Sequence, residues 1–268
     1  MNIAIVGSGP SAFYTTQSLL REDQDIKIDI FEKLPAPFGL VRYGVAPDHQ
    51  KTKNIIRLFS KYLDEENVAY FGNVNIGKDV SIELISQLYD AVIISSGASL
   101  DKELILEGDN YKNLFGSAEF VGWYNGNPLH SKLNPNFRTK NAVIIGNGNV
   151  ALDCARILSK SKEELYQSDI MDYALDTLST SAIENIYIIG RRTPKEAKFT
   201  ISELREMGEL KTFEPKVNYN KEDLEKILNS GELDTKVKKN IEVLLSFKSN
   251  QKKYKKKIIF KFLSSPYK

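Results

Sequence analysis

The segment Asn141-Ala-Val-Ile-Ile-Gly-Asn-Gly-Asn-Val-Ala-Leu-Asp-Cys154 joins a short apolar, β-branched run to a glycine turn and then to helix-forming residues. This pattern predicts a strand, a tight turn and a helix whose first N–H groups point at one place. A pyrophosphate binds well there because the N–H groups donate to it and the helix dipole favours its charge. The same glycines also suit a turn that binds nothing, so the spacing alone leaves both interpretations open.

A second predicted strand, Asn185–Ile189, ends in Gly190-Arg191-Arg192. In dinucleotide-binding folds the residue after the second strand contacts the adenosine ribose: a carboxylate takes the 2′-hydroxyl, whereas arginine binds a 2′-phosphate. Arginine pairs are also common on solvated surfaces. Because this pair stands at a strand end behind a glycine turn, and no acid is present, we expect a site for NADP rather than NAD.

The same arrangement occurs at the start of the chain. Asn2–Val6 is predicted as a strand, Gly7-Ser-Gly-Pro-Ser-Ala12 as the turn and Phe13–Arg21 as the helix. The next predicted strand alternates isoleucine with polar residues and closes at Glu32. A carboxylate at this position suits a ribose with free hydroxyls. We therefore expect FAD or NAD at this first site.

Length and composition limit the function classes. The chain has 268 residues, of which 41% are hydrophobic and 27% charged, as in a globular protein of one or two domains. No apolar run approaches the ~20 residues that span a bilayer, so we expect no integral membrane association. The start of the chain lacks a charged-then-apolar leader, which leads us to expect bacterial cytoplasm or an organelle matrix. Cys154 is the only cysteine, which excludes an intrachain disulfide and a Cys-x-x-Cys redox pair. We expect no metal site and no nucleic-acid partner.

The charge is unevenly distributed along the chain. Residues 211–268 carry fifteen lysines and seven acidic residues, for a net charge of +8, whereas residues 1–210 carry −6. The basic end is a candidate docking surface for an acidic partner, because such a field speeds encounter and weakens with salt. Ordinary solvated lysines explain the same composition equally well.

The connecting segments carry further expectations. Leu34–His49 holds three prolines and two glycines, so we expect a long loop without regular structure at the end of a strand, where ligands of open α/β sheets bind. We expect Asp48 to cap a helix from His49 to about Glu65, and Val68–Phe71 to form a hairpin-like pair with Val74–Ile76. Thr200 and Glu203 have the spacing of a capping box.

Several segments together resemble the adrenodoxin reductase type of ferredoxin-NADP reductases. The unusual loop from Pro37 to His49 makes the resemblance more specific than the glycine motifs do, and it is dense over residues 1 to about 210. The segments are Val6–Thr15, Phe31–Lys33, Pro37–His49, Phe120–Gly126, Gly148–Asp153 and Ser202–Met207.

The resemblance implies an α/β fold with two Rossmann-like dinucleotide-binding domains. Residues 1–98 are expected to begin the FAD-binding domain. Residues 99–268 are expected to form the NADP-binding domain and the start of a return to the FAD domain. Because the family's FAD domain is split between two parts of the chain, we expect the FAD domain here to be incomplete.

The resemblance also implies roles for individual residues. His49 lies where the family places a residue near the flavin; it is either a proton or hydrogen-bond partner in catalysis or only an anchor for the helix start. Glu203 is either an NADP contact or only a helix cap. An acidic iron-sulfur partner, a ferredoxin or adrenodoxin-like protein, is expected to dock at Lys236, Lys238 and Lys239. The implied FAD-site residues are Gly7, Gly9, Pro10, Ser11, Glu32, Leu40 and Ile76, and the implied NADP-site residues are Gly146, Asn147, Gly148, Asn149, Arg191, Arg192 and Glu203.

These features predict a FAD-dependent oxidoreductase that passes electrons from NADPH to a ferredoxin-type iron-sulfur protein. One alternative is an NADPH-oxidising flavin subunit that serves another acceptor, such as an amidotransferase-type synthase. The other is a non-catalytic NADP-binding fragment.

Overall fold

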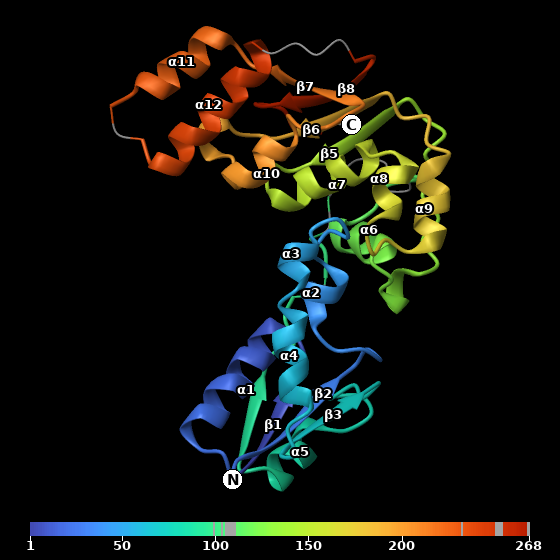
Figure 1. The fold of residues 1–268 in the computed structure, drawn as a ribbon, viewed down its shortest axis with the longest axis vertical. Helices are drawn as coiled ribbons and strands as arrows, with labels where there is room; N and C mark the ends of the chain where they lie inside the picture. The colour runs from blue at the N-terminus through green and yellow to red at the C-terminus, as the bar shows by residue number, and fades with distance from the viewer. Residues whose placement is uncertain (99, 103, 105–110, 232, 250–253, 267–268) are drawn as a thin grey trace. The chain divides into compact units, whose positions relative to one another are not determined.

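A computed structural model describes residues 1–98, 100–102, 104, 111–231, 233–249 and 254–266. The chain divides into two compact units, the first made of Met1–Asp101 and Ala118–Lys132 and the second of Lys102–Ser117 and Leu133–Lys268 (Figure 1). The first break lies close to the expected domain boundary at residue 98, but the return of residues 118–132 to the first unit was not expected. The Gly, Asp and Asn content of Ala98–Phe115 predicts a crossing between domains, and this segment lies partly outside the described residues.

The first unit is built on a four-stranded parallel sheet with the order β3-β2-β1-β4. Helix α1 (Pro10–Glu22) connects β1 to β2. Because all the pairings are parallel, the carboxyl ends of the strands meet at one edge of the sheet, where Val6, Phe31 and Ile94 lie in register. The first glycine turn and Glu32 therefore lie at the same edge. The strands are β1 (Asn2–Val6), β2 (Lys27–Glu32), β3 (Val68–Gly72) and β4 (Ala91–Ile94).

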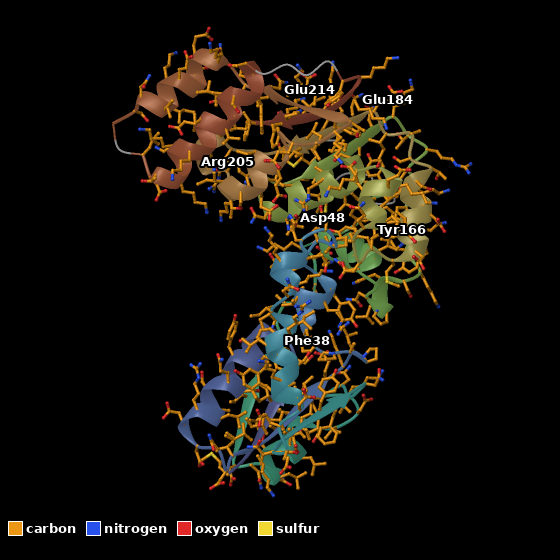
Figure 2. The ribbon with its side chains drawn as sticks, in the orientation of Figure 1. Phe38, Asp48, Tyr166, Glu184, Arg205 and Glu214 are labelled. Carbon is orange, nitrogen blue, oxygen red and sulfur yellow. The ribbon has the colours of Figure 1, made fainter. Side chains whose placement is uncertain are left out.

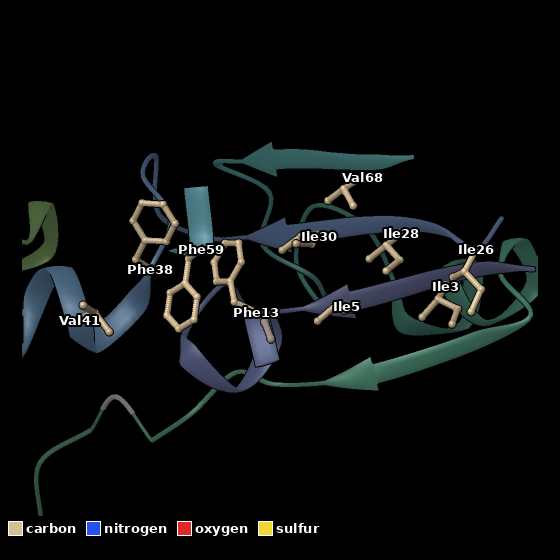
Figure 3. Close-up of a cluster of buried hydrophobic side chains, with 11 residues drawn as sticks. Ile3, Ile5, Phe13, Ile26, Ile28, Ile30, Phe38, Val41, Phe59 and Val68 are labelled. Carbon is tan, nitrogen blue, oxygen red and sulfur yellow. The ribbon is translucent and has the colours of Figure 1, made fainter. Parts of the chain in front are cut away.

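Alternation along β1 and β2 sorts their side chains onto the two faces of this sheet. Figure 3 shows the larger cluster, in which the isoleucines of β1 and β2 join Phe13 of α1 and Phe59 of α4 (Ile56–Leu63). The cluster on the opposite face is smaller, and there Ala4 and Phe31 pack against Ile85 of α5 (Ile82–Leu88). The buried isoleucines are Ile3, Ile5, Ile28 and Ile30.

Three local predictions for the first unit are wrong. The segment expected to lack regular structure contains a short helix, α2 (Gly39–Tyr43). The single helix expected from residue 49 is two pieces, α3 (Gln50–Lys53) and α4, and α3 has His49 rather than Asp48 at its N-cap. The hairpin does not form, because β3 adds in parallel to β2 and Ile76 makes only an isolated bridge to Val80.

The end of the first unit is formed by α6 (Ser117–Tyr124) and the 3-10 turn η1 (Pro128–His130). The sequence predicts a helix over Ala118–Tyr124 that ends at Asn125-Gly126. Helix α6 ends there, because Gly126 adopts a left-handed φ of 77° and the Asn127 N–H donates to Gly122 O at 2.8 Å.

The second unit holds a parallel sheet with the order β5-β6-β8-β7, whose strands are β5 (Asn141–Ile145), β6 (Asn185–Ile189), β7 (Phe213–Asn218) and β8 (Lys256–Lys261). The apolar spacing in the sequence predicts helices within Lys162–Ser181, near Leu224–Leu228 and near Val237–Leu245, and a basic strand at Lys257–Leu263. The structure has helices and a strand in these segments. Strand β7 was not expected, because Pro215 and Lys216 interrupt its apolar pattern. The helices are α7 (Asn149–Ser159), α8 (Lys162–Tyr166), α9 (Asp172–Ser179), α10 (Ile201–Glu206), α11 (Lys221–Asn229) and α12 (Thr235–Ser249), with the 3-10 turn η2 (Pro194–Glu196).

Among the described residues, no helix combines the length and the apolar character needed to cross a bilayer.

Candidate functional site

The second glycine turn presents an open surface in front of α7. Gly146 has a φ of 136°, which favours glycine, and its N–H donates to Ile189 O at 2.8 Å. Gly148 is the N-cap of α7, and no side chain caps this helix. A Cβ built on Gly146 or on Gly148 would meet nothing within 4 Å. The uncapped helix start and the open space before it fit the pyrophosphate of a dinucleotide.

The two asparagines of this turn contact the segments beside it. The Asn147 carboxamide occupies the space that a side chain at Gly190 would need, and its Oδ1 is buried without a hydrogen-bond partner among the described residues. The Asn149 Oδ1 accepts from the Thr200 N–H at 2.7 Å. Both asparagines thus hold neighbouring segments in place as well as lying at the predicted site.

Arg191 and Arg192 follow Gly190 at the end of β6, and both are exposed. In the part of the chain that the structure describes, neither guanidinium has a carboxylate within ion-pair distance. The pKa of the nearby Glu196 is lowered mainly by the hydrogen bond from the Thr193 hydroxyl, and the charge of Arg192 lowers it only slightly. Both guanidiniums are therefore available to an external anion, as a 2′-phosphate site requires.

Glu203 does not form the predicted capping box. Thr200 is the N-cap of α10, but its side chain makes no cap hydrogen bond. The Glu203 carboxylate instead accepts from Arg156 at 3.0 Å. The predicted NADP contact of Glu203 stays a prediction.

Arg156 explains why the cap is lost. Its side chain is only 2% exposed and lies 2.6 Å from Asp153 and 3.3 Å from Glu206, in addition to Glu203. A buried guanidinium needs such partners, so it draws Glu203 away from the backbone of α10. This cluster joins α7 to α10 and was not predicted from the sequence. The spacing of Asp153 and Arg156, three residues apart in a predicted helix, was the only signal.

The first glycine turn has a similar construction. Gly7 has a φ of 104°, and a Cβ there would collide with the carbonyl oxygen of Ser95. Gly9 is the N-cap of α1 without a side-chain cap, Pro10 is the first helical residue and Ser11 is exposed. A Cβ on Gly9 would meet nothing within 4 Å, so the space before this helix is open as well. This turn also fits a pyrophosphate.

Glu32 ends β2 as predicted, but protein donors already hold its carboxylate. Oε2 accepts from the Ser8 N–H at 3.0 Å and from the Ser8 hydroxyl at 2.7 Å, and Oε1 accepts from the Leu34 N–H at 3.0 Å. A carboxylate offers about four acceptor directions, so the arrangement leaves room for one ribose hydroxyl. Burial and, second, the charge of Glu32 raise the pKa of Tyr70 to about 12. The role of Ser8 was not predicted, because the fingerprint constrains only its glycine neighbours.

The loop after β2 returns to the first turn. The Phe38 N–H donates to Ser8 O at 2.9 Å, and a Cβ on Gly39 would stand 2.8 Å from the Gly9 Cα. Phe38, labelled in Figure 2, has a left-handed φ of 87° that its burial against Phe13 stabilises. Leu40 is 65% exposed beside this contact. This loop therefore places an apolar side chain next to the open turn.

The remaining predicted residues lie in separate places. Ile76 packs at the edge of the Ala4 and Phe31 cluster. His49 is half-buried at the N-cap of α3, where its side chain makes no cap hydrogen bond. The three lysines of α12 are exposed in its first turns, namely Lys236, Lys238 and Lys239.

Two parallel sheets, each with an uncapped helix behind a glycine turn, define the class of proteins with two dinucleotide-binding motifs. Residues 1–189 match the model of the pyridine nucleotide-disulphide oxidoreductase family, and the chain belongs to that family.

Individual relatives agree with the predicted resemblance. The chain is 43% identical over 215 residues to the mitochondrial NADPH:adrenodoxin oxidoreductase of Salvelinus fontinalis, which covers 80% of this chain and 43% of that protein. It is 40% identical over 270 residues to the NADPH-ferredoxin reductase FprA of Mycobacterium tuberculosis, covering 98% of this chain and 59% of that protein. The solved structure of Mycobacterium tuberculosis FprA in complex with NADPH matches with a TM-score of 0.90 and 40% identity, over 99% of this chain and 60% of that chain.

The resemblance to adrenodoxin reductases and the α/β class are thereby confirmed. The chain spans about half the length of the curated relatives it matches.

Proposed function

We propose that this chain belongs to a FAD-dependent oxidoreductase that passes electrons from NADPH to a ferredoxin-type iron-sulfur protein. The observation that supports this most is the difference between two equivalent strand ends. At the end of β2 stands the carboxylate of Glu32, and after β6 stand the exposed guanidiniums of Arg191 and Arg192. One position suits a ribose with hydroxyls and the other a ribose with a 2′-phosphate. The names of the relatives support the same acceptor.

Each unit contributes binding groups to one nucleotide. The first N–H groups of α7 hold the pyrophosphate of NADPH, and Arg191 with Arg192 binds its 2′-phosphate. The first N–H groups of α1 hold the pyrophosphate of FAD, and the remaining acceptor direction of Glu32 takes a ribose hydroxyl. FAD, when bound, supplies the conversion of a two-electron hydride into the single electrons that an iron-sulfur protein accepts.

We also propose a docking surface and a location. Lys236, Lys238 and Lys239 stand in the first turns of α12, where the helix dipole disfavours cations. An acidic partner would relieve this unfavourable placement, which supports docking of a ferredoxin there. Bacterial cytoplasm or an organelle matrix is the proposed location, because relatives include mitochondrial and bacterial proteins.

The nucleotide assignment is tested by titrating NADP⁺ and NAD⁺ into wild-type protein and into Arg191→Ala and Arg192→Ala. Loss of a charge-assisted hydrogen bond should weaken NADP⁺ binding by about 1.5–3 kcal/mol in each variant and leave NAD⁺ unchanged. Arg138→Ala is the matched control, because Arg138 is an exposed arginine ahead of the amino end of β5. Equal losses for both nucleotides in the two variants would contradict the assignment.

The acceptor is tested by the visible spectrum and by NADPH-dependent ferredoxin reduction over a salt series. We expect flavin absorbance and a rate that falls with ionic strength, and falls less in a variant with Lys236, Lys238 and Lys239 replaced by Ala. A flavoprotein that oxidises NADPH without reducing ferredoxin would favour a different acceptor. Colourless protein that takes up no FAD and still binds NADPH would favour a non-catalytic NADP-binding role.

A further inference from the structure

Lys198 lies beside the second glycine turn, although fifty residues separate it from Gly148 in the sequence. Its backbone N–H donates to Asn147 O at 2.8 Å, and two residues later the Thr200 N–H donates to Asn149 Oδ1 at 2.7 Å. Asn147 stands between the two glycines of the turn, and Asn149 is the first residue of α7. Two hydrogen bonds thus hold the segment 198–200 along the turn at which the pyrophosphate is expected.

The residue after Lys198 anchors the segment to the second unit. The Phe199 side chain is fully buried and packs edge-on against Phe260 of β8. The Phe199 carbonyl accepts from the buried Asn240 amide of α12 at 3.0 Å. Because Phe199 is buried in the core and hydrogen bonds fix segment 198–200, Lys198 lies on the solvent-facing side of this segment, and its side chain is exposed.

The charge of Lys198 is not neutralised within the described part of the chain, where no carboxylate lies at ion-pair distance from it. The same holds for Arg191 and Arg192, which follow the neighbouring strand. An extended lysine side chain is about 6 Å long and carries a compact ammonium charge that suits phosphate oxygens. The turn is therefore flanked by three exposed cations for which the described residues supply no carboxylate partner.

We propose that Lys198 binds the pyrophosphate of the nicotinamide nucleotide at this turn, as a cation separate from the two arginines that select the 2′-phosphate. This inference rests on the proposed function, since it assigns a further binding residue to the same site. The backbone of Lys198 is bonded to the turn itself, whereas the arginines extend from the end of β6. Lys198 thus serves the phosphates that NADP⁺ and NAD⁺ share, and Arg191 and Arg192 serve the phosphate in which they differ.

The test titrates NADP⁺ and NAD⁺ into wild-type protein, Lys198→Ala and Lys198→Arg. Lys198→Ala should weaken the binding of both nucleotides by a similar factor, about tenfold to a hundredfold, as expected for one lost hydrogen bond between charged groups. Lys198→Arg should recover most of the affinity for both. Lys140→Ala is the control with the same change of charge, because Lys140 precedes β5 and pairs with Glu184 at 3.4 Å; its affinities should match wild type.

The outcomes separate this inference from the proposed function. Unchanged affinities in Lys198→Ala would overturn the inference. A loss of affinity for NADP⁺ alone would also overturn it, because Lys198 would then bind the 2′-phosphate together with the arginines. Selective loss of NADP⁺ in the arginine variants tests the nucleotide assignment independently of either result.

Discussion

The carboxamide of Asn147 lies directly against Gly190, so that a methyl group at residue 190 would overlap its Nδ2 atom. This contact joins the turn after β5 to the residue that precedes Arg191 and Arg192. Gly190 has no left-handed φ, and its requirement for glycine is therefore one of space. The proposed NADP site consists of this turn and the Arg191-Arg192 pair. Both parts depend on the close packing of the Asn147 side chain against the Gly190 backbone.

Gly190→Ala should destabilise the second unit and weaken NADP⁺ binding, because Asn147 must move out of its position. Overpacking of this kind costs about 1–3 kcal/mol. Urea unfolding of wild type, Gly190→Ala, Asn147→Ala and the double variant measures the coupling between the two residues. The double variant should be more stable than Gly190→Ala alone. If the two losses simply add, the steric explanation is wrong.

Arg156→Met should lower the free energy of unfolding by about 3 kcal/mol, because it leaves three carboxylates facing each other without their cation. The Arg156 side chain is 2% exposed. Lys162→Ala serves as the control, since Lys162 and Asp176 are 51% and 75% exposed, and its loss should stay below about 1 kcal/mol. Chemical denaturation at neutral pH measures both. Similar losses in the two variants would show that the Arg156 cluster contributes no more than a surface pair.

Ser8→Ala removes the hydroxyl that donates to the buried Glu32 carboxylate and leaves the backbone N–H bond in place. A hydrogen bond to a charged group contributes about 1.5–3 kcal/mol, so unfolding should occur at clearly lower urea concentration and FAD should bind less tightly. Ser18→Ala is the matched control: Ser18 is exposed on α1, where its hydroxyl donates to Tyr14 O. A Ser8→Ala protein as stable as Ser18→Ala would contradict the importance of this bond.

We expect the contribution of Tyr89 to the free energy of unfolding to be lost at alkaline pH. Burial, followed by its hydrogen bond to Asp29 at 2.5 Å, raises the Tyr89 pKa from 10.0 to about 12. A raised pKa in the folded state means that the stabilisation is complete below pH 10 and is lost as the pH rises toward 12. The difference in unfolding free energy between wild type and Tyr89→Phe should therefore shrink over this range. A difference independent of pH would mean that the phenol is not perturbed by its surroundings.

Local sequence patterns were sufficient for the parts of the fold that local physics controls. Both glycine turns, both following helices and the strands that begin and end each nucleotide motif follow from spacing and apolar periodicity, because a strand-turn-helix unit is specified within about twenty residues. The contrast between Glu32 and the Arg191-Arg192 pair was visible for the same reason, since each follows the end of a recognisable strand.

Contacts between residues far apart in the sequence determined the rest. Strand β3 joined β2 in parallel instead of forming a hairpin, because pairing there extends a sheet whose hydrogen-bonding edge was open. Glu203 left its predicted cap because a buried guanidinium 47 positions earlier in the chain needed its charge. Ser8 reached Glu32, and Lys198 reached the second turn, through hydrogen bonds that no local pattern records. Folding placed these partners together because buried charges and buried backbone groups must be satisfied wherever a partner can be found.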